Sequence, residues 1–150
     1  ETLMEIERKY LIPEIPNNLH ITKTRKLEQG YLCTSPVVRI RKDNDQYELT
    51  YKSSGLMVRQ EYNLPLTKEA YEHLRKKADG RLIVKTRYEI PLDDRHKIEL
   101  DIFPGDLAPL ILAEVEFADE DEANQFTPPE WFGEDVTFSS RYHNSNLSRL

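Results

Sequence analysis

The 150-residue sequence contains a single cysteine, Cys33, and only five glycines. A lone cysteine cannot form an internal disulfide bond, which favours a reducing, cytoplasmic location, and we expect Cys33 to be a small buried core residue. The glycines lie too far apart to form a G-x-x-x-x-G-K or G-x-G-x-x-G loop, so any bound phosphate must be held by side chains. No apolar run approaches the roughly 18 residues that span a membrane, so no membrane partner is expected.

Motifs for zinc and for nucleophilic catalysis are also missing. The histidines show no H-x-x-x-H spacing and no cysteine partner, which argues against zinc, and solvated surface positions are expected for His20, His73, His96 and His143. No G-x-S-x-G motif occurs. The net charge of −6 argues against a general nucleic-acid-binding protein, because such domains usually carry a net basic face.

Alternation of apolar and polar residues dominates the chain and predicts strands at 3–11, 26–33, 36–43, 46–52, 57–64, 82–91, 95–103 and 111–118. Short turns between them favour antiparallel neighbours. Helical spacing follows the N-cap Thr67 and stops at Gly80, and Asp119 with Glu122 forms a capping box for a short helix through Phe126. The tail is expected to end in a short helix. The class is α+β, mainly antiparallel β, in one domain over 1–150, and eight strands allow a closed barrel or a sandwich.

Charged side chains recur at every second position of nearly every expected strand. Like charges two residues apart occur at Glu5/Glu7, Arg39/Arg41, Lys85/Arg87, Glu99/Asp101 and Glu114/Glu116. Such pairs lie roughly 7 Å apart on one face and repel by about 0.6 kcal/mol in water. A solvated face explains any one strand, but the whole set is typical of a site whose countercharges arrive from outside. Carboxylate pairs suit Mg²⁺ or Mn²⁺ and paired cations suit phosphate, so the pattern predicts a metal–polyphosphate site.

Short motifs follow one another along nearly the whole chain: E-x-E-x-K (5–9), QGYL (29–32), VRIRK (38–42), R-x-E (59–61), K-x-R (85–87), E-x-D-x-F (99–103) and AEVEF (113–117). This ordered series resembles the CYTH superfamily, the triphosphate tunnel metalloenzymes. The resemblance implies a closed eight-stranded antiparallel β-barrel with peripheral helices and a charged, triphosphate-binding tunnel. It also implies that apolar positions face outward, under helices or a partner: Ile6, Ile40, Leu49, Tyr88, Leu100 and Val115.

By position, the resemblance gives the charged residues roles. Phosphate binding falls to Arg39, Arg41, Lys52, Arg59, Lys85 and Arg87, with Tyr31 lining the tunnel and Arg141 closing over its mouth. Metal binding falls to Glu5, Glu7, Glu61, Asp101, Glu114 and Glu116. Lys9 is expected to be the catalytic residue beside the attacked phosphorus, where it orients water or stabilises charge.

The function implied is hydrolysis of the terminal phosphoanhydride of inorganic tripolyphosphate by a divalent-metal-dependent triphosphatase, with Mg²⁺ or Mn²⁺ and with nucleoside triphosphates as secondary substrates. Several alternatives stay open: a class IV-type adenylyl cyclase, a thiamine triphosphatase, a non-catalytic polyphosphate-binding module, and charged strands that are plain solvent faces. The oligomeric state stays open between a monomer and a homodimer, since members of the family often dimerise.

Overall fold

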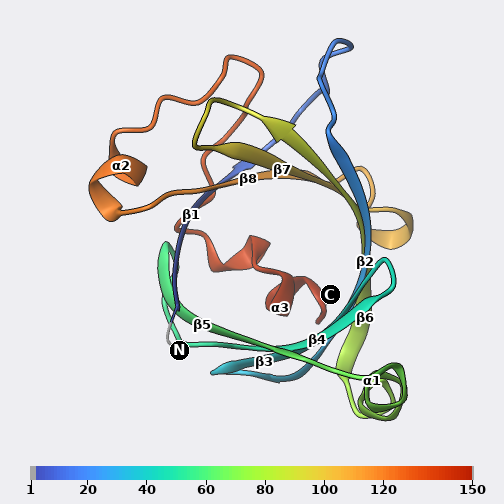
Figure 1. Cartoon of the computed structure of the whole chain (residues 1–150). Coiled ribbons are helices and arrows are strands. Elements are labelled where there is room, and N and C mark those ends of the chain that lie inside the picture. The colour runs from blue at the N-terminus through green and yellow to red at the C-terminus, as the bar shows by residue number, and fades with distance from the viewer. Residues whose placement is uncertain (1–2, 150) are drawn as a thin grey trace.

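The computed structural model describes residues 3–149, and its eight strands form one closed antiparallel barrel in the order β1-β5-β4-β3-β2-β6-β7-β8 (Figure 1). The barrel confirms the predicted fold class and decides against the sandwich. The strands are β1 (Leu3–Leu11), β2 (Lys23–Thr34), β3 (Val37–Asp43), β4 (Gln46–Lys52), β5 (Val58–Pro65), β6 (Asp79–Pro91), β7 (Lys97–Ile102) and β8 (Ile111–Glu116).

The helices are short and lie between or after the strands. Helix α1 (Lys68–Arg75) begins at its predicted cap, where Thr67 Oγ1 accepts a hydrogen bond from the Ala70 amide at 3.0 Å. It ends before Gly80 because β6 already starts at Asp79. Helix α2 (Glu120–Asn124) has the predicted cap at Asp119, and the tail forms α3 (Asn144–Leu147). Two 3-10 turns complete the set, η1 (Gly105–Leu107) and η2 (Ser140–Tyr142). Over residues 3–149, no helix has the length and apolar character needed to cross a bilayer.

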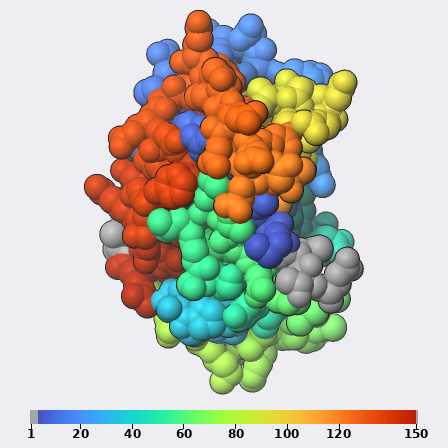
Figure 2. Space-filling model, turned by 90° about the vertical axis from the view of Figure 1, so that its left-hand side faces the viewer, coloured from blue at the N-terminus to red at the C-terminus, as the bar shows by residue number. Residues whose placement is uncertain are grey.

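The outer, apolar face of β1, β7 and β8 is covered mainly by loops. Ile6, Leu100 and Val115 are buried there, together with aromatic side chains from the chain after β8. Trp131 belongs to this cover, with its ring centroid 4.7 Å from that of Phe132. Figure 2 shows the orange-to-red chain after β8 over much of this face, with only small dark-blue patches of β1 visible. Of the other outward positions, Ile40 is buried, while Leu49 and Tyr88 are half-buried.

The interior changes from charged to apolar along the barrel axis. On β8, Glu116 and Glu114 are followed toward the barrel's end by Leu112, which packs with Phe103 in a second core cluster. Leu147 of α3 joins this cluster, and in Figure 1 α3 lies within the ring of strands. The side chains of α3 and the second core cluster therefore close one end of the barrel.

The expectation of a buried Cys33 is wrong, because the side chain is exposed. A β-bulge shifts the register of β2 against β3 between Tyr31 and Cys33. Tyr31 pairs with Arg39, which points inward, whereas Cys33 pairs with its neighbour Val38. The bulge thus turns Cys33 to the outer surface at the end of β2.

Candidate functional site

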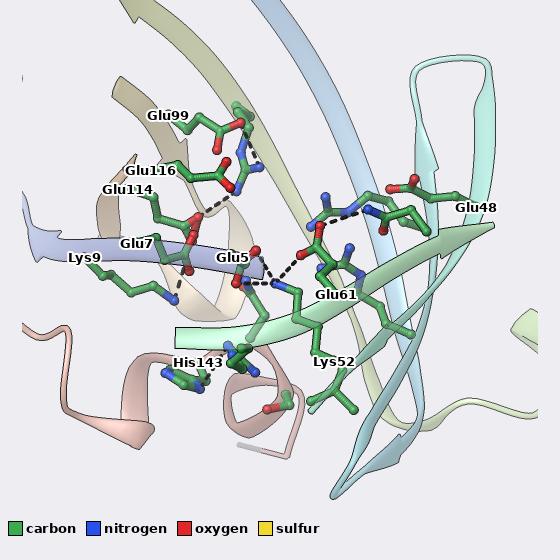
Figure 3. Close-up of a pocket in the computed structure, with 18 of the residues that line it drawn as sticks. Glu5, Glu7, Lys9, Glu48, Lys52, Glu61, Glu99, Glu114, Glu116 and His143 are labelled. Carbon is green, nitrogen blue, oxygen red and sulfur yellow. Dashed lines mark hydrogen bonds and ion pairs between the residues drawn. The ribbon is translucent and has the colours of Figure 1, made fainter. Parts of the chain in front are cut away.

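A cavity of about 220 Å³ lies inside the barrel, and charged side chains line nearly all of it (Figure 3). Its walls include most of the predicted site residues: Glu5, Glu7, Lys9, Tyr31, Arg39, Arg41, Lys52, Arg59, Glu61, Arg87, Glu114 and Glu116. They come from strands all around the barrel, where the pleat turns every second residue inward. The like-charge pairs that stood out along the sequence therefore face a shared interior space.

Lys85 and Asp101 are not among the residues that line this cavity. Both side chains are buried behind its wall, with 1% exposure each. Lys85 Nζ lies 2.7 Å from Asp101 Oδ2 as an ion pair, and Arg87 donates hydrogen bonds to both Asp101 oxygens at 2.7 and 2.8 Å. Burial lowers the pKa of Lys85 to about 7 even beside this carboxylate. Asp101 is thus placed as the counterion of two buried cations.

Arg141 also lies away from the cavity. Its side chain is exposed, and its guanidinium carbon lies 5.5 Å from the centroid of the Tyr142 ring. The 3-10 turn η2 directs it to an outer groove that it shares with Leu11 and Leu110.

The tail instead contributes His143, Asn144 and Ser145 to the cavity. The expectation of a solvated His143 is wrong, because its exposure is 7%. Its Nδ1 lies 3.4 Å from Arg59 Nη2, and since a guanidinium only donates, Nδ1 must be the acceptor. Burial, with the charges of Lys9 and Arg59, lowers the pKa of His143 to about 3, so the ring is neutral.

The other histidines divide into exposed and half-buried positions. His20 and His73 are exposed as expected, while His96 is half-buried, with its Nδ1 2.9 Å from Asp93 Oδ1. Further cavity residues that sequence reasoning did not assign are Arg25, Glu48 and Asn63, while Glu99, for which the resemblance implied a minor part in metal binding, also lines the cavity. Glu48 and Glu99 carried the alternating-charge signal, and His143 lay in the polar RYHNSNL tail segment.

Among residues 3–149, three carboxylates that line the cavity form no ion pair, namely Glu7, Glu48 and Glu116. Glu7 and Glu116 are cross-strand neighbours on β1 and β8, and among residues 3–149 neither side chain makes a hydrogen bond or an ion pair. Burial, together with the nearby charges of Glu114 and Glu5, raises the pKa of Glu7 to about 8. Desolvation and the charge of Glu5 raise the pKa of Glu116 to about 7. A bound cation would relieve both effects.

The remaining carboxylates are held by lysine or arginine. Lys52 Nζ lies 2.9 Å from Glu5 and 3.3 Å from Glu61, as Figure 3 shows. Burial outweighs the charge of Lys52 and raises the pKa of Glu5. For Glu61, desolvation is outweighed by hydrogen bonding and by Lys52, and the pKa falls to about 2.

The donor chemistry of these side chains fits a hard divalent cation, since carboxylate oxygens are the ligands that Mg²⁺ and Mn²⁺ prefer. Within the part of the chain that the structure describes, no three His, Cys, Asp or Glu side chains are already gathered to hold a metal. Binding would therefore use the adjacent, unpartnered Glu7 and Glu116 and draw other carboxylates away from their lysine or arginine partners.

Three buried arginines of the cavity, on β3 and β5, have no carboxylate partner among the described residues. Arg39, Arg41 and Arg59 are 5, 6 and 8% exposed, and among the described residues none of them forms an ion pair with an acid. Arg39 donates to Thr50 Oγ1 at 3.1 Å, but the Nε atoms of Arg39 and Arg59 have no hydrogen-bond partner in this part of the chain. Burial and the charges of Arg39 and Arg87 lower the pKa of Arg41 to about 9. Buried donors left unpaired cost free energy, which an anionic ligand would recover.

Lys9 lies beside the carboxylates. Its ammonium is 3.5 Å from Glu114 Oε1 and donates to the Tyr142 carbonyl at 3.4 Å, and the side chain is 4% exposed. Arg87 Nη2 donates to the other Glu114 oxygen at 3.2 Å. Lys9 and Arg87, despite burial, lower the pKa of Glu114 well below its usual range, so Glu114 stays ionised next to Lys9.

Comparison with known proteins places this tunnel in a family. The family model described as the CYTH domain matches residues 3–150. An inorganic triphosphatase of Nitrosomonas europaea is 44% identical over 150 residues, which cover 97% of each chain. An inorganic triphosphatase of Acetivibrio thermocellus is 34% identical over 148 residues, covering 95% of this chain and 92% of that relative.

Solved structures with the same fold support this family assignment. The crystal structure of an inorganic triphosphatase superposes with a TM-score of 0.69 at 42% identity, covering 96% of this chain and 93% of that one. A Bacillus halodurans protein, 18% identical, shares the fold with a TM-score of 0.61 over 99% of this chain and 93% of its own. With a closed charged barrel and a match over nearly its whole length, the chain belongs to the CYTH domain family.

Proposed function

We propose that this protein hydrolyses the terminal phosphoanhydride bond of inorganic tripolyphosphate, with Mg²⁺ or Mn²⁺ as the metal. The observation that carries the proposal is the separation of unpaired charges within one cavity. Among the described residues, Arg39 and Arg41 on β3 and Arg59 on β5 form no ion pair with an acid, and Glu7 on β1 and Glu116 on β8 form none with a base. A phosphate chain with a bound divalent ion has the complementary arrangement, and both relatives named above are inorganic triphosphatases.

The phosphate chain is bound by the unpaired arginines. Their guanidinium groups carry donors that have no protein partner, and arginine suits phosphate because two N–H groups can bind two oxygens at once. Lys52 adds a further cation at the cavity wall, and Tyr31 lines the same space. Arg87 faces the cavity too, but its carboxylate partners make it part of the framework that holds the cavity wall.

The metal is held by Glu7 and Glu116, with Glu5, Glu61 and Glu114 as further ligands. When bound, a divalent ion neutralises phosphate charge and lowers the pKa of water. Asp101, predicted as a ligand from the resemblance, has both oxygens engaged by Lys85 and Arg87, and we leave it out of this set.

Lys9 is the proposed catalytic residue. Phosphoryl transfer depends mainly on positioning and charge neutralisation, so a fixed ammonium beside the attacked phosphorus stabilises the charge that develops on its oxygens. Glu114 and the Tyr142 carbonyl fix the position of this ammonium. The apolar cluster beyond it, which includes Leu112 and Leu147, keeps bulk water from entering at the closed end.

The domain organisation, cellular location and assembly of the protein are also proposed. We propose a single CYTH-type domain over residues 1–150 that acts in the cytoplasm, as the lone cysteine suggests. A homodimer is the proposed assembly, on the resemblance to the family, and sedimentation analysis tests it.

The activity is tested by incubating the protein with tripolyphosphate or ATP, with Mg²⁺, with Mn²⁺ and with a chelator, and by identifying the products. The proposal expects metal-dependent release of orthophosphate, faster from tripolyphosphate than from ATP. Pyrophosphate with cyclic AMP would identify a cyclase, and faster turnover of thiamine triphosphate a thiamine triphosphatase. Binding without turnover would contradict hydrolysis and leave a polyphosphate-binding module.

A further inference from the structure

Two buried arginines of the tunnel are anchored in opposite ways. Arg87 donates to Asp101, Glu99 and Glu114, so acids surround and neutralise its charge. Arg41 is equally buried, but its hydrogen-bonded anchor is the neutral side chain of Gln29. Its cross-strand neighbour on β4, Glu48, forms no ion pair with it. The Gln29 carbonyl oxygen accepts from Arg41 Nε at 2.8 Å and from Nη2 at 2.6 Å.

The side chain of Gln29 is itself held in a fixed orientation. Gln29 is fully buried, and its amide nitrogen donates to the Tyr31 hydroxyl at 3.0 Å. Because a guanidinium has no acceptor, the amide oxygen must face Arg41, and the Tyr31 contact takes up the other end of the amide. Gln29 and Tyr31 pair in regular register with Arg41 and Arg39 of β3, and residues two apart on a strand point to the same side, so both side chains face inward.

Gly30 permits the close packing at this point. A Cβ atom there would lie 2.8 Å from Leu82 Cδ2 and 2.9 Å from Ala78 Cβ, so a larger residue would displace the neighbouring chain. The three residues of this stretch thus act together. Gln29 holds Arg41, Gly30 allows the neighbouring chain to pack closely, and the Tyr31 hydroxyl orients the Gln29 amide.

We propose that Gln29 is a positioning residue that aims Arg41 into the tunnel while leaving its positive charge uncancelled for an anionic phosphate group. The inference rests on the proposed function, because it assumes that a phosphate chain occupies the cavity. A carboxylate at position 29 would accept the same two hydrogen bonds from Arg41, and would accept one from the Tyr31 hydroxyl where the amide donates to it, but it would neutralise the charge of Arg41. A neutral anchor therefore fixes the orientation of Arg41 without neutralising its charge.

The test compares Gln29→Glu with Gln29→Leu, and uses Gln60→Glu as the control for the chemical change. Gln60 is exposed on the outer face of β5, so its replacement adds the same charge outside the tunnel. Ligand-free melting temperature, tripolyphosphate affinity by calorimetry, and KM and kcat are measured for each protein.

Gln29→Glu is expected to melt no lower than the wild type, because Arg41 gains a charged partner, yet to bind tripolyphosphate about tenfold or more weakly. Its KM should rise more than its kcat falls. Gln29→Leu should lose both stability and affinity, and Gln60→Glu should change affinity by less than about twofold, as an exposed charge does.

If the wild type binds tripolyphosphate, either of two results would overturn the inference about Gln29 without contradicting the proposed function. One is a Gln29→Glu variant with wild-type affinity. The other is a Gln29→Glu variant that loses stability and affinity together, like Gln29→Leu, which would reduce Gln29 to a packing role. Absence of tripolyphosphate binding by the wild type would overturn the proposed function, and the inference with it.

Discussion

Replacement of Lys9 by alanine separates catalysis from folding in this tunnel. Lys9 is almost fully buried and contacts Glu114 and the Tyr142 carbonyl. The substitution removes one of the two cations on Glu114, but Arg87 still donates to that carboxylate at 3.2 Å. Because one partner remains, we expect a loss of about 2 kcal/mol in the free energy of unfolding, less than the 3–5 kcal/mol typical when a buried charge loses its whole partner. The melting temperature should fall by about 4–8 °C.

The effect on turnover should be much larger than the effect on stability. Removing one preorganised group that stabilises transition-state charge usually lowers kcat by about 10²–10³. The loss of turnover is measured as the initial rate of orthophosphate release from tripolyphosphate. The assay temperature lies at least about 20 °C below the melting temperature of the variant, so that the protein stays folded. Affinity for tripolyphosphate should fall much less, since the unpaired arginines remain.

The control is Lys42→Ala, which removes a lysine from the exposed, outer side of β3 next to Arg41. It should keep wild-type kcat and melting temperature. A folded Lys9→Ala protein with wild-type turnover would refute the role given to Lys9.

The remaining predictions concern binding, pH and framework. Arg59→Ala should raise the KM for tripolyphosphate about tenfold, and an unchanged KM in steady-state kinetics would contradict phosphate binding by this side chain. The pKa of Glu7 is raised to about 8 in the native protein, so metal-free protein keeps a proton that the unfolded chain releases. Urea unfolding in chelator should show stability falling as pH rises from about 4.5 to 8, and Glu7→Gln should flatten this slope; an equal slope in both proteins would exclude Glu7 as its source. Asp101→Asn should lower the free energy of unfolding by about 3 kcal/mol or more, because Lys85 and Arg87 lose their shared counterion. Unchanged melting with lost metal affinity would instead make Asp101 a metal ligand.

Strong period-two patterns made the strands predictable. Every expected strand exists, and each boundary lies within a few residues of the prediction because charged and apolar side chains alternate without a break. The pattern alone could not separate lumen from solvent, since a charged face satisfies either environment. The ordered motifs supplied that step through the family resemblance.

The electrostatic state of each cation was not predictable, because it depends on register between strands. Lys85/Arg87 and Arg39/Arg41 look alike in sequence, yet Arg87 lies opposite Asp101 and forms an ion pair with it. Arg41 lies between Gln29 on β2 and Glu48 on β4, and its hydrogen bonds go to Gln29.

The tail was misjudged for a related reason. It consists of short turns without a strand or long-helix period, so nothing in the sequence showed which side chain enters the barrel. The family resemblance implied that Arg141 closes over the tunnel mouth, but the chain turns His143 inward instead.

The most direct test of the central claim is a crystal structure of the protein with magnesium and a non-hydrolysable imidotriphosphate. We expect the phosphate chain inside the barrel, with its oxygens bound by Arg39, Arg41 and Arg59 and with the metal ion on Glu7 and Glu116. A ligand bound outside the barrel, or a metal ion on Asp101 in place of Lys85 and Arg87, would contradict it.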